Sequence, residues 1–403
     1  MTRTKLDNWI ERIEALPNLT REGLESLQLR RLNETLARVK ERGGFYKDHP
    51  EKLESLEQLK TLPFTTADDL AENPGGFLVT SQSEVSRVIS GATSGTTAPP
   101  KRVFYTETDT EHTVGFFAAG ISEMLRPGEK CLIAFPFTGP FGLGDLIAKA
   151  VERLGGIPVR AGYGQSWGEL CRLVRETEPE TYIGFPVALL GLARMYGAGF
   201  PIRRALVSGD AGPAGVMAEL EGLLGSRLYP HYGSRECGLG GAVTCPAFAG
   251  MHLRENHILP EIIDADGNVL PEGETGELVI STIGADAMPL VRYRTGDFTR
   301  LLPPCPCGGV TRRIDAVSRR ESTLSMEALD SAMFAVAGLV DYRAVFDGEL
   351  RLDCLCLDSG CGEKLRRALR RVYPHLKGKV TVSPVTMEHG PMYPGKRHVI
   401  GCV

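Results

Sequence analysis

No stretch of this sequence is apolar for long enough to cross a membrane. The longest apolar runs, such as residues 131–137, are far shorter than the roughly 20 residues that a helix needs to span a bilayer. The first 16 residues include Arg3 and Lys5 but no apolar core, so they are not typical of a secretory signal. We therefore expect a cytoplasmic protein without a membrane partner.

Basic residues are not in excess either. The chain has 46 Lys and Arg against 50 Asp and Glu, which gives a formal charge of -4. Because nucleic-acid-binding domains are usually basic, this balance argues against a nucleic-acid partner. A short basic cluster at residues 364–371 spaces its apolar members as a helix does, and we interpret it as a solvated helix face.

Disulfides are not expected, although the chain has ten cysteines. In a reducing compartment, cysteines occur as thiols or metal ligands. The sequence also contains no internal repeat and no low-complexity tract. These absences leave the class of globular intracellular proteins.

The length of 403 residues exceeds what one ordinary core accommodates, so we expect one large and one small domain. Between residues 111 and 208, predicted helices alternate with short apolar strands, as in an α/β domain with a largely parallel sheet. After Tyr232 the pattern changes to strands and turns, with a hairpin signal at residues 261–268. The final stretch, beyond residue 317, alternates helices and strands as in a small α+β domain.

A loop of small residues follows the predicted strand at residues 87–89. It reads SGATSGTTAPPK over residues 90–101 and ends on Lys101. Small residues let main-chain N–H groups approach an anion, hydroxyls add donors, and the lysine adds a positive charge. The loop is therefore suited to the phosphates of a nucleotide. It is not a G-x-x-x-x-G-K-[ST] loop, because Lys101 follows two prolines and no strand–loop–helix pattern fits.

Four further segments follow in order. They read HYGSRE at residues 231–236, YRTGD at 293–297, SRRES at 318–322 and PGK at 394–396. An aromatic ring offers a π face to a base, and a glutamate suits a hard cation shared with phosphate. An ionised aspartate accepts hydrogen bonds from paired hydroxyls. These residue types match the parts of a nucleotide.

Together, the loop and these segments resemble the signatures of the adenylate-forming superfamily. The resemblance implies an α/β fold with a large N-terminal adenylation domain containing parallel-rich sheets, at residues 1–317, and a small C-terminal α+β lid domain at 318–403. Ala98 stands where the family usually has glycine, and Arg235 replaces a Thr or Ser, although a guanidinium there can pair with phosphate. The residues that the resemblance assigns to ATP and AMP are Thr93, Ser94, Gly95, Thr96, Thr97, Lys101, Ser208, Gly209, Asp210, His231, Tyr232, Gly233, Ser234, Arg235, Asp297 and Arg319.

The resemblance also implies individual roles. Glu236 helps to hold Mg²⁺ at the phosphates, Asp297 accepts from the ribose hydroxyls, and Arg319 makes a second ribose contact near the hinge between domains. Lys396 reaches into the active site from the lid and stabilises the charge of the adenylation transition state. Glu236 and Lys396 are thus the implied catalytic residues.

From about residue 25 onward, the chain more narrowly resembles the phenylacetate–coenzyme A ligase family. The matching segments lie at residues 44–47, 59–70, 245–246, 250–252, 255–257 and 261–264, with Asn256 in place of the family's usual Asp. The resemblance implies a carboxylic acid and coenzyme A as small-molecule substrates. The sequence does not determine the oligomeric state, and a homodimer stays open.

A cysteine cluster suggests a metal. Cys305 and Cys307 supply two thiolates, and Cys245 with His252 would complete a tetrahedral zinc site. Some members of the family carry zinc near this place, which implies a structural Zn²⁺ here. Cys237 and His257 are alternative ligands, and reduced core cysteines are the alternative interpretation.

The identity of the acid depends on a phenylalanine-rich segment. Phe135, Phe137 and Phe141 lie where the family lines its acyl pocket, which favours an aromatic or other apolar acid; the alternative is an ordinary core. The expected reaction forms acyl-AMP and pyrophosphate, then transfers the acyl group to coenzyme A. Three alternatives remain: acyl transfer to a protein, AMP transfer to another acceptor, and a nucleotide sensor without catalysis.

Overall fold

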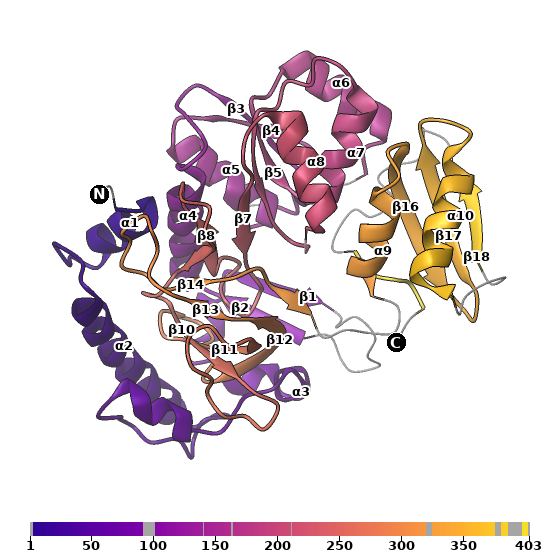
Figure 1. Ribbon diagram of the computed structural model, residues 1–403. Helices are drawn as coiled ribbons and strands as arrows, with labels where there is room; N and C mark the ends of the chain where they lie inside the picture. The colour runs from indigo at the N-terminus through magenta and orange to yellow at the C-terminus, as the bar shows by residue number, and fades with distance from the viewer. Residues whose placement is uncertain are drawn as a thin grey trace. The chain divides into compact units, whose positions relative to one another are not determined.

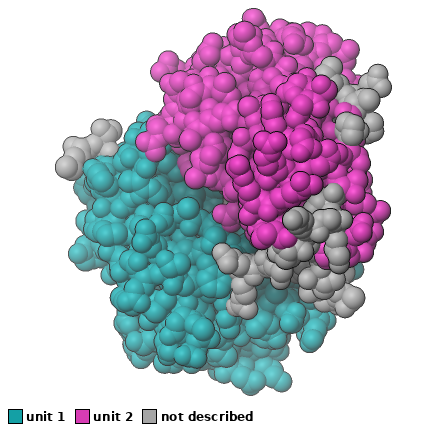
Figure 2. All heavy atoms as spheres, turned by 45° about the vertical axis from the view of Figure 1, so that its right-hand side comes forward, with its two compact units in different colours: residues 1–123, 231–320 teal, residues 124–230, 321–403 magenta. Residues whose placement is uncertain are grey.

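The computed structural model describes residues 3–91, 101–139, 141–162, 164–210, 212–319, 325–374, 380–385 and 397–401. The chain divides into two compact units (Figure 2). Unit 1 comprises Met1–Glu123 and His231–Arg320, and unit 2 comprises Met124–Pro230 and Glu321–Val403. Among the described residues, no helix has the length and apolar character that crossing a bilayer requires.

Unit 2 contains a parallel sheet with the strand order β4-β3-β5-β6-β7. Helices follow the strands in the chain and flank the sheet in space (Figure 1). All four residues of β5 are buried, as expected for a strand covered on both faces. The alternation predicted from the sequence is confirmed, and its elements are β3 (Lys130–Ile133), α5 (Leu143–Arg153), β4 (Ile157–Arg160), α6 (Trp167–Thr177), β5 (Thr181–Gly184), α7 (Pro186–Tyr196), β6 (Arg204–Val207), α8 (Ala214–Leu224) and β7 (Tyr229–Tyr232).

The C-terminal part of unit 2 is a three-stranded α+β element. Strand β16 pairs antiparallel with β17, which pairs parallel with β18. Its elements are α9 (Met326–Phe334), β16 (Leu339–Phe346), β17 (Leu350–Cys356), α10 (Cys361–Val372) and β18 (Val380–Pro384). The small α+β element expected after residue 317 is thereby confirmed.

This C-terminal element shares a hydrophobic core with α6, α7 and α8. Arg194 of α7 donates hydrogen bonds to the main-chain oxygens of Phe334 and Leu339, both at 2.7 Å. Gly191 allows the close approach, because a Cβ there would lie 2.4 Å from the Val340 oxygen. The chain passes between the units at residues 320 and 321, near the predicted boundary at 317 and 318, which stays a prediction for the functional domains.

The N-terminal part of unit 1 is helical. Thr66 and Thr106 begin α3 and α4 with capping boxes, in which Asp69 and Asp109 bond back to the cap residues. The helices are α1 (Lys5–Ile13), α2 (Arg21–Arg42), α3 (Ala67–Glu72) and α4 (Glu107–Ile121). A hairpin of β1 (Arg87–Gly91) and β2 (Lys101–Tyr105) lies between α3 and α4 in the chain.

The rest of unit 1 is antiparallel sheet. The predicted hairpin at residues 261–268 forms as a turn with a bridge between Ile263 and Val269, and β10 pairs along its length with β11, within the sheet order β10-β11-β12-β15. The end of β7 continues through β8, β9, β14 and β13. The strands are β8 (Ala242–Thr244), β9 (Met251–Leu253), β10 (Ile258–Ile263), β11 (Gly276–Thr282), β12 (Tyr293–Thr299), β13 (Leu301–Leu302), β14 (Arg313–Ile314) and β15 (Ser318–Arg319). Together with α2 and the β1–β2 hairpin, they enclose one core.

Candidate nucleotide-binding site

The hairpin of β1 and β2 holds both ends of the predicted phosphate loop. Gly91 pairs with Lys101, so the chain leaves and re-enters the hairpin at neighbouring positions. The loop residues assigned to phosphate lie outside the described residues: Thr93, Ser94, Gly95, Thr96 and Thr97. Lys101 is the first residue of β2, and its position is therefore set by the strand.

Lys101 joins two other predicted segments. Its Nζ lies 2.6 Å from Glu236 Oε1 and 3.0 Å from the hydroxyl of Tyr293. The Tyr293 hydroxyl also donates to Glu236 Oε1 at 3.3 Å. Side chains more than 190 residues apart in sequence thus share one carboxylate oxygen in unit 1.

The charge of Lys101 sets the protonation state of Glu236, whose side chain is buried. Burial alone would raise the pKa of Glu236, but the ammonium and its hydrogen bond more than offset this effect, so the pKa is lowered. Burial and the neighbouring Glu236 charge raise the pKa of Tyr293, which keeps its hydroxyl a donor. The arrangement presents an ionised carboxylate of the kind that binds a divalent cation.

A second group forms around Asp297 on β12. Its Oδ2 accepts from the Tyr232 hydroxyl at 2.9 Å, and its Oδ1 lies 3.4 Å from Arg319 Nε. Strand β15 supplies this arginine, because Asp297 and Arg319 are paired across the two strands. The carboxylate thus has a hydroxyl on one oxygen and a guanidinium beside the other.

A bulge in β12 precedes Asp297. Val279 of β11 pairs with Arg294, whereas Glu277 pairs with Phe298, so β12 has extra residues at this point. Gly296 takes a φ of 73°, which glycine adopts at little cost. This explains the glycine of the YRTGD segment in structural terms.

The segment at residues 231–236 packs tightly. A Cβ on Gly233 would lie 2.2 Å from the Leu239 oxygen, which accounts for glycine there. The ring of His231 lies 5.9 and 5.8 Å from Phe116 and Phe117, and burial lowers its pKa to about 4. The Ser234 main-chain N–H donates to the Cys237 sulfur. The ring of Tyr232 is buried.

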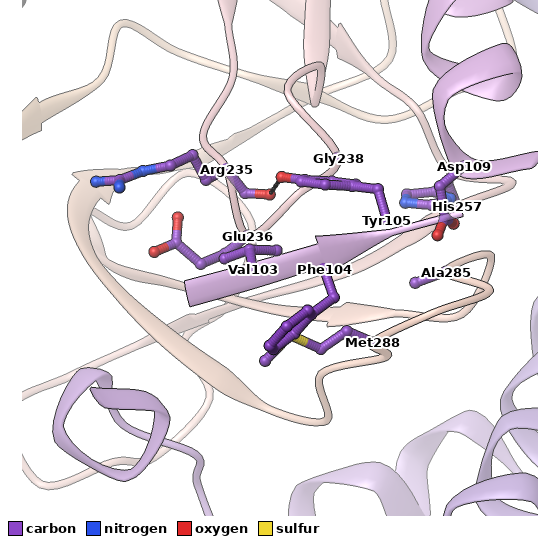
Figure 3. A pocket seen from close by; sticks show the side chains of 10 residues that line it. All are labelled: Val103, Phe104, Tyr105, Asp109, Arg235, Glu236, Gly238, His257, Ala285 and Met288. Atoms are coloured by element: carbon purple, nitrogen blue, oxygen red, sulfur yellow. Dashed lines mark hydrogen bonds between the residues drawn. The ribbon is translucent and has the colours of Figure 1, made fainter. Parts of the chain in front are cut away.

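Arg235 is anchored through its main chain. The Tyr105 hydroxyl donates to the Arg235 carbonyl oxygen, as the dashed line in Figure 3 marks. The side chains of Arg235 and Glu236 extend to the same side of that view, away from Asp109 and His257. A guanidinium and an ionised carboxylate therefore lie beside each other at the position where the sequence predicts the phosphate end of the nucleotide.

The other residues assigned to nucleotide belong to unit 2. Ser208, Gly209 and Asp210 follow β6, at the carboxyl end of a parallel strand, where ligands of α/β sheets usually bind. Gly209 takes a φ of 91°, and Asp210 accepts the main-chain N–H of Arg397. Lys396, the predicted lid lysine, lies outside the described residues.

The three phenylalanines of the predicted acyl pocket contact different partners. Phe135 is buried, with its ring centroid 5.0 Å from that of Phe185. Arg160 lies over the Phe137 ring at 4.8 Å, and Lys149 over the Phe141 ring at 5.4 Å. Phe137 lines a surface hollow together with Pro136, Thr138, Arg160 and Gly162.

The four residues proposed as metal ligands come together in unit 1. One ligand atom from each of Cys245, His252, Cys305 and Cys307 lies within 4.8 Å of the others. The sulfurs of Cys245 and Cys305 are 3.7 Å apart, and the Cys307 sulfur is 3.4 Å from His252 Nε2. Ligands about 2.3 Å from a tetrahedral zinc ion are roughly 3.8 Å apart, so the spacing fits that metal.

Contacts of Nδ1 set the orientation of the His252 ring. Its Nδ1 lies 3.0 Å from both the main-chain oxygen and the hydroxyl of Thr311, and that hydroxyl donates to Asp7 of α1. This arrangement directs Nε2 toward the thiols, as the outer partners of zinc-binding histidines do. Cys237 instead bonds to Ser234, and neither it nor His257 belongs to the group. None of the nine described cysteines forms a disulfide, as expected.

Four residues of these sites escaped prediction. Tyr293 stood in a recognised segment, but its bond to Glu236 joins two segments that are 57 residues apart in the sequence. Tyr105, Asp7 and Thr311 act through long-range contacts that no local spacing signals. The one signal in the sequence that could have predicted any of these contacts is Tyr293, because it is the first residue of the YRTGD segment.

Comparison with known proteins assigns the family. Residues 89–286 match the family model of the AMP-binding enzymes. The chain is 33% identical to a phenylacetate–coenzyme A ligase of Pseudomonas putida, covering 70% of this chain and 67% of the relative. It is 31% identical to the corresponding ligase of Escherichia coli K12, over 80% of this chain and 76% of the relative.

A solved structure shares the fold. The 2-hydroxyisobutyryl-CoA ligase in its postadenylation state superposes with a TM-score of 0.74 at 20% identity, covering 94% of this chain and 89% of that one. The predicted adenylate-forming fold class is therefore confirmed. With the motifs of residues 231–236 and 293–297 in place, the chain belongs to the phenylacetate–coenzyme A ligase family of AMP-binding enzymes.

Proposed function

We propose that this enzyme is an AMP-forming acid–CoA ligase that takes an aromatic carboxylic acid. The observation that carries the proposal is the pairing of Lys101 and Glu236 beside Tyr293, since it combines three separately predicted segments. The relatives' activity with phenylacetate and coenzyme A supports the substrate class. Phe137, which lines the hollow in unit 2, supports an acid with an apolar body.

In the first half-reaction, a carboxylate oxygen attacks the α-phosphorus of ATP, and the bond to pyrophosphate breaks. Glu236 would help to hold the Mg²⁺ that accompanies ATP, and the ion would neutralise phosphate charge. Lys101 then exchanges its carboxylate partner for phosphate oxygens, while Asp297 accepts from the ribose hydroxyls. Residues 93–97 would hold the outer phosphates and Lys396 would stabilise the transition state.

In the second half-reaction, the thiol of coenzyme A attacks the acyl carbon, and AMP leaves. Arg319 would contact the ribose near the boundary between the predicted domains, and its present neighbour Asp297 supports this role. We also propose that the small C-terminal domain rotates between the two half-reactions.

A structural Zn²⁺ belongs to the same proposal. Cys245, Cys305, Cys307 and His252 would bind it, because their spacing and the Thr311 contact suit a closed four-ligand site. Such an ion would join the loop before β9 to the turn that carries Cys305 and Cys307. It would take no part in the chemistry, since four protein ligands leave no open position.

The test is the exchange of labelled pyrophosphate into ATP with a panel of aryl and aliphatic acids, repeated with Lys396→Ala. We expect aryl acids to stimulate exchange and the substitution to abolish it. Exchange without consumption of coenzyme A would point to a protein acyl acceptor or to AMP transfer. ATP binding without exchange for any acid would instead favour a sensor.

A further inference from the structure

Two cysteines of the C-terminal element lie beside each other at the two ends of a short turn. Cys356 is the last residue of β17, Cys361 is the first residue of α10, and residues 357–360 join them. The thiol of Cys361 donates a hydrogen bond to the sulfur of Cys356. These two residues, here called the dithiol pair, are separate from the group proposed to bind zinc.

The main chain around the dithiol pair holds the two residues in place. The N–H of Leu357 donates to the oxygen of Gly338 at 2.8 Å. A Cβ on Gly338 would lie 3.4 Å from the sulfur of Cys361, so this thiol lies directly against the glycine. The residue after Gly338 is Leu339, which pairs with Cys356 across β16 and β17. Both cysteines therefore lie beside the same short segment of chain.

The two thiols of the pair differ in exposure and in acidity. Cys356 is half-buried, whereas Cys361 is 0% exposed. The hydrogen bond between them lowers the pKa of Cys356, against the effect of burial, and raises the pKa of Cys361. An accessible thiol of lowered pKa beside a second, resolving thiol is the arrangement found at cysteines that are oxidised selectively.

A third cysteine nearby lacks these properties. Cys354 lies two residues before Cys356 on β17 and is 0% exposed. Burial raises the pKa of Cys354, so it is present as the unreactive thiol. Cys354 therefore serves as a matched control for the dithiol pair.

We propose that the dithiol pair is a modification site, at which a small hydroperoxide oxidises Cys356 and Cys361 then closes a disulfide. This inference goes beyond the proposed function and does not depend on it. The disulfide would join the end of β17 covalently to the start of α10.

The chemistry is balanced by the peroxide alone. In the first step, the Cys356 thiolate attacks one oxygen of hydrogen peroxide; an S–O bond forms, the O–O bond breaks, and the departing hydroxide takes up a proton to leave as water. In the second step, the sulfur of Cys361 attacks the sulfenic acid; an S–S bond forms, the S–O bond breaks, and a second water leaves with the thiol proton. Two thiols and one peroxide thus give one disulfide and two waters.

The test treats the full-length protein with hydrogen peroxide, alkylates the remaining thiols after denaturation, and examines the peptides by mass spectrometry. Trypsin cleaves after Arg351 and Lys364, which places all three cysteines in the peptide at residues 352–364. The variants are Cys356→Ser and Cys361→Ser, with Cys354→Ser as the control. A diketone that reacts with sulfenic acids is added in a parallel sample.

We expect the wild type and Cys354→Ser to lose two alkylatable thiols together in this peptide and to regain them with a dithiol reductant. Cys361→Ser should stop at the sulfenic acid, so that the diketone labels Cys356. In Cys356→Ser, oxidation of the peptide should slow by about tenfold or more, because the thiolate is the reactive species.

The proposal fails if the wild-type peptide keeps its thiols at a peroxide dose that oxidises the buried Cys171. It also fails if Cys356→Ser is oxidised as fast as the wild type, or if the disulfide disappears in Cys354→Ser. Fragment spectra of the wild-type peptide identify the bonded cysteines directly, so the test holds even where a variant does not fold.

Discussion

The nucleotide residues of unit 1 bond to one another, whereas the phenylalanines of unit 2 do not. Lys101, Glu236 and Tyr293 share one carboxylate oxygen, but Phe135, Phe137 and Phe141 each contact a different partner. Buried charged side chains need partners even when no ligand is bound, because burying an unpaired ion costs folding free energy. Apolar side chains carry no such requirement, so their placement says less about the ligand. The residues predicted to bind the nucleotide are therefore better defined than those predicted to contact the acid.

We expect the largest loss of activity from a substitution among the charged residues predicted to bind the nucleotide. Glu236→Gln removes the charge that would hold Mg²⁺ and should lower kcat for pyrophosphate exchange by about 10²–10³-fold. Glu272→Gln, at an exposed glutamate, is the control. Steady-state exchange at saturating ATP measures both. Near-wild-type kcat in the Glu236 variant would exclude its role at the metal.

The cysteine cluster extends the comparison to a third region. Cys245→Ser should remove bound zinc and lower the melting temperature of the protein, by about 2–4 °C for each kcal/mol lost. Cys171→Ser, in a helix of unit 2, should keep the zinc. Metal analysis and thermal melting of both variants test this. A wild-type protein purified without zinc, and insensitive to added zinc, would favour the reduced core cysteines.

A smaller effect is expected at the ribose end. Tyr232→Phe removes the hydroxyl that donates to Asp297, and a hydrogen bond to a charged group contributes about 1.5–3 kcal/mol. We expect the KM for ATP to rise by roughly tenfold, with little change in kcat. Tyr373→Phe, in the C-terminal element, is the control. An unchanged KM would mean that Asp297 holds its position without Tyr232.

The pairing of Lys101 with Glu236 predicts a specific dependence of the protein's stability on pH. In the wild type, the Glu236 pKa is lowered, so its contribution to stability is present above the unfolded pKa and is lost as pH falls through the folded pKa. In Lys101→Met, only the main-chain hydrogen bond and the Arg235 charge oppose burial, so the pKa of Glu236 rises relative to the wild type and the carboxylate contributes less stability as pH rises. The gap in melting temperature between variant and wild type should widen from about pH 4 to 6.

Thermal melting across that pH range measures this gap, with Lys47→Met, at an exposed lysine, as control. A gap that does not change with pH would mean that the ammonium does not set the Glu236 charge.

Local patterns predicted much of the fold and less of the site. Strand–helix alternation predicted the parallel sheet between residues 111 and 208, because buried strands and amphipathic helices have short periods. The link between Lys101 and Glu236 could be expected only from the family resemblance, since 135 residues separate them. The Asp7 contact behind His252 depends on tertiary packing, which no local period encodes.

The measurement that tests the central claim most directly is a balance of products with an aryl acid, ATP and coenzyme A. An AMP-forming acid–CoA ligase predicts that AMP, pyrophosphate and the aryl thioester appear in equal amounts, and that none forms when the acid is omitted. Release of AMP without loss of the free thiol, or formation of ADP in place of AMP, would contradict the account.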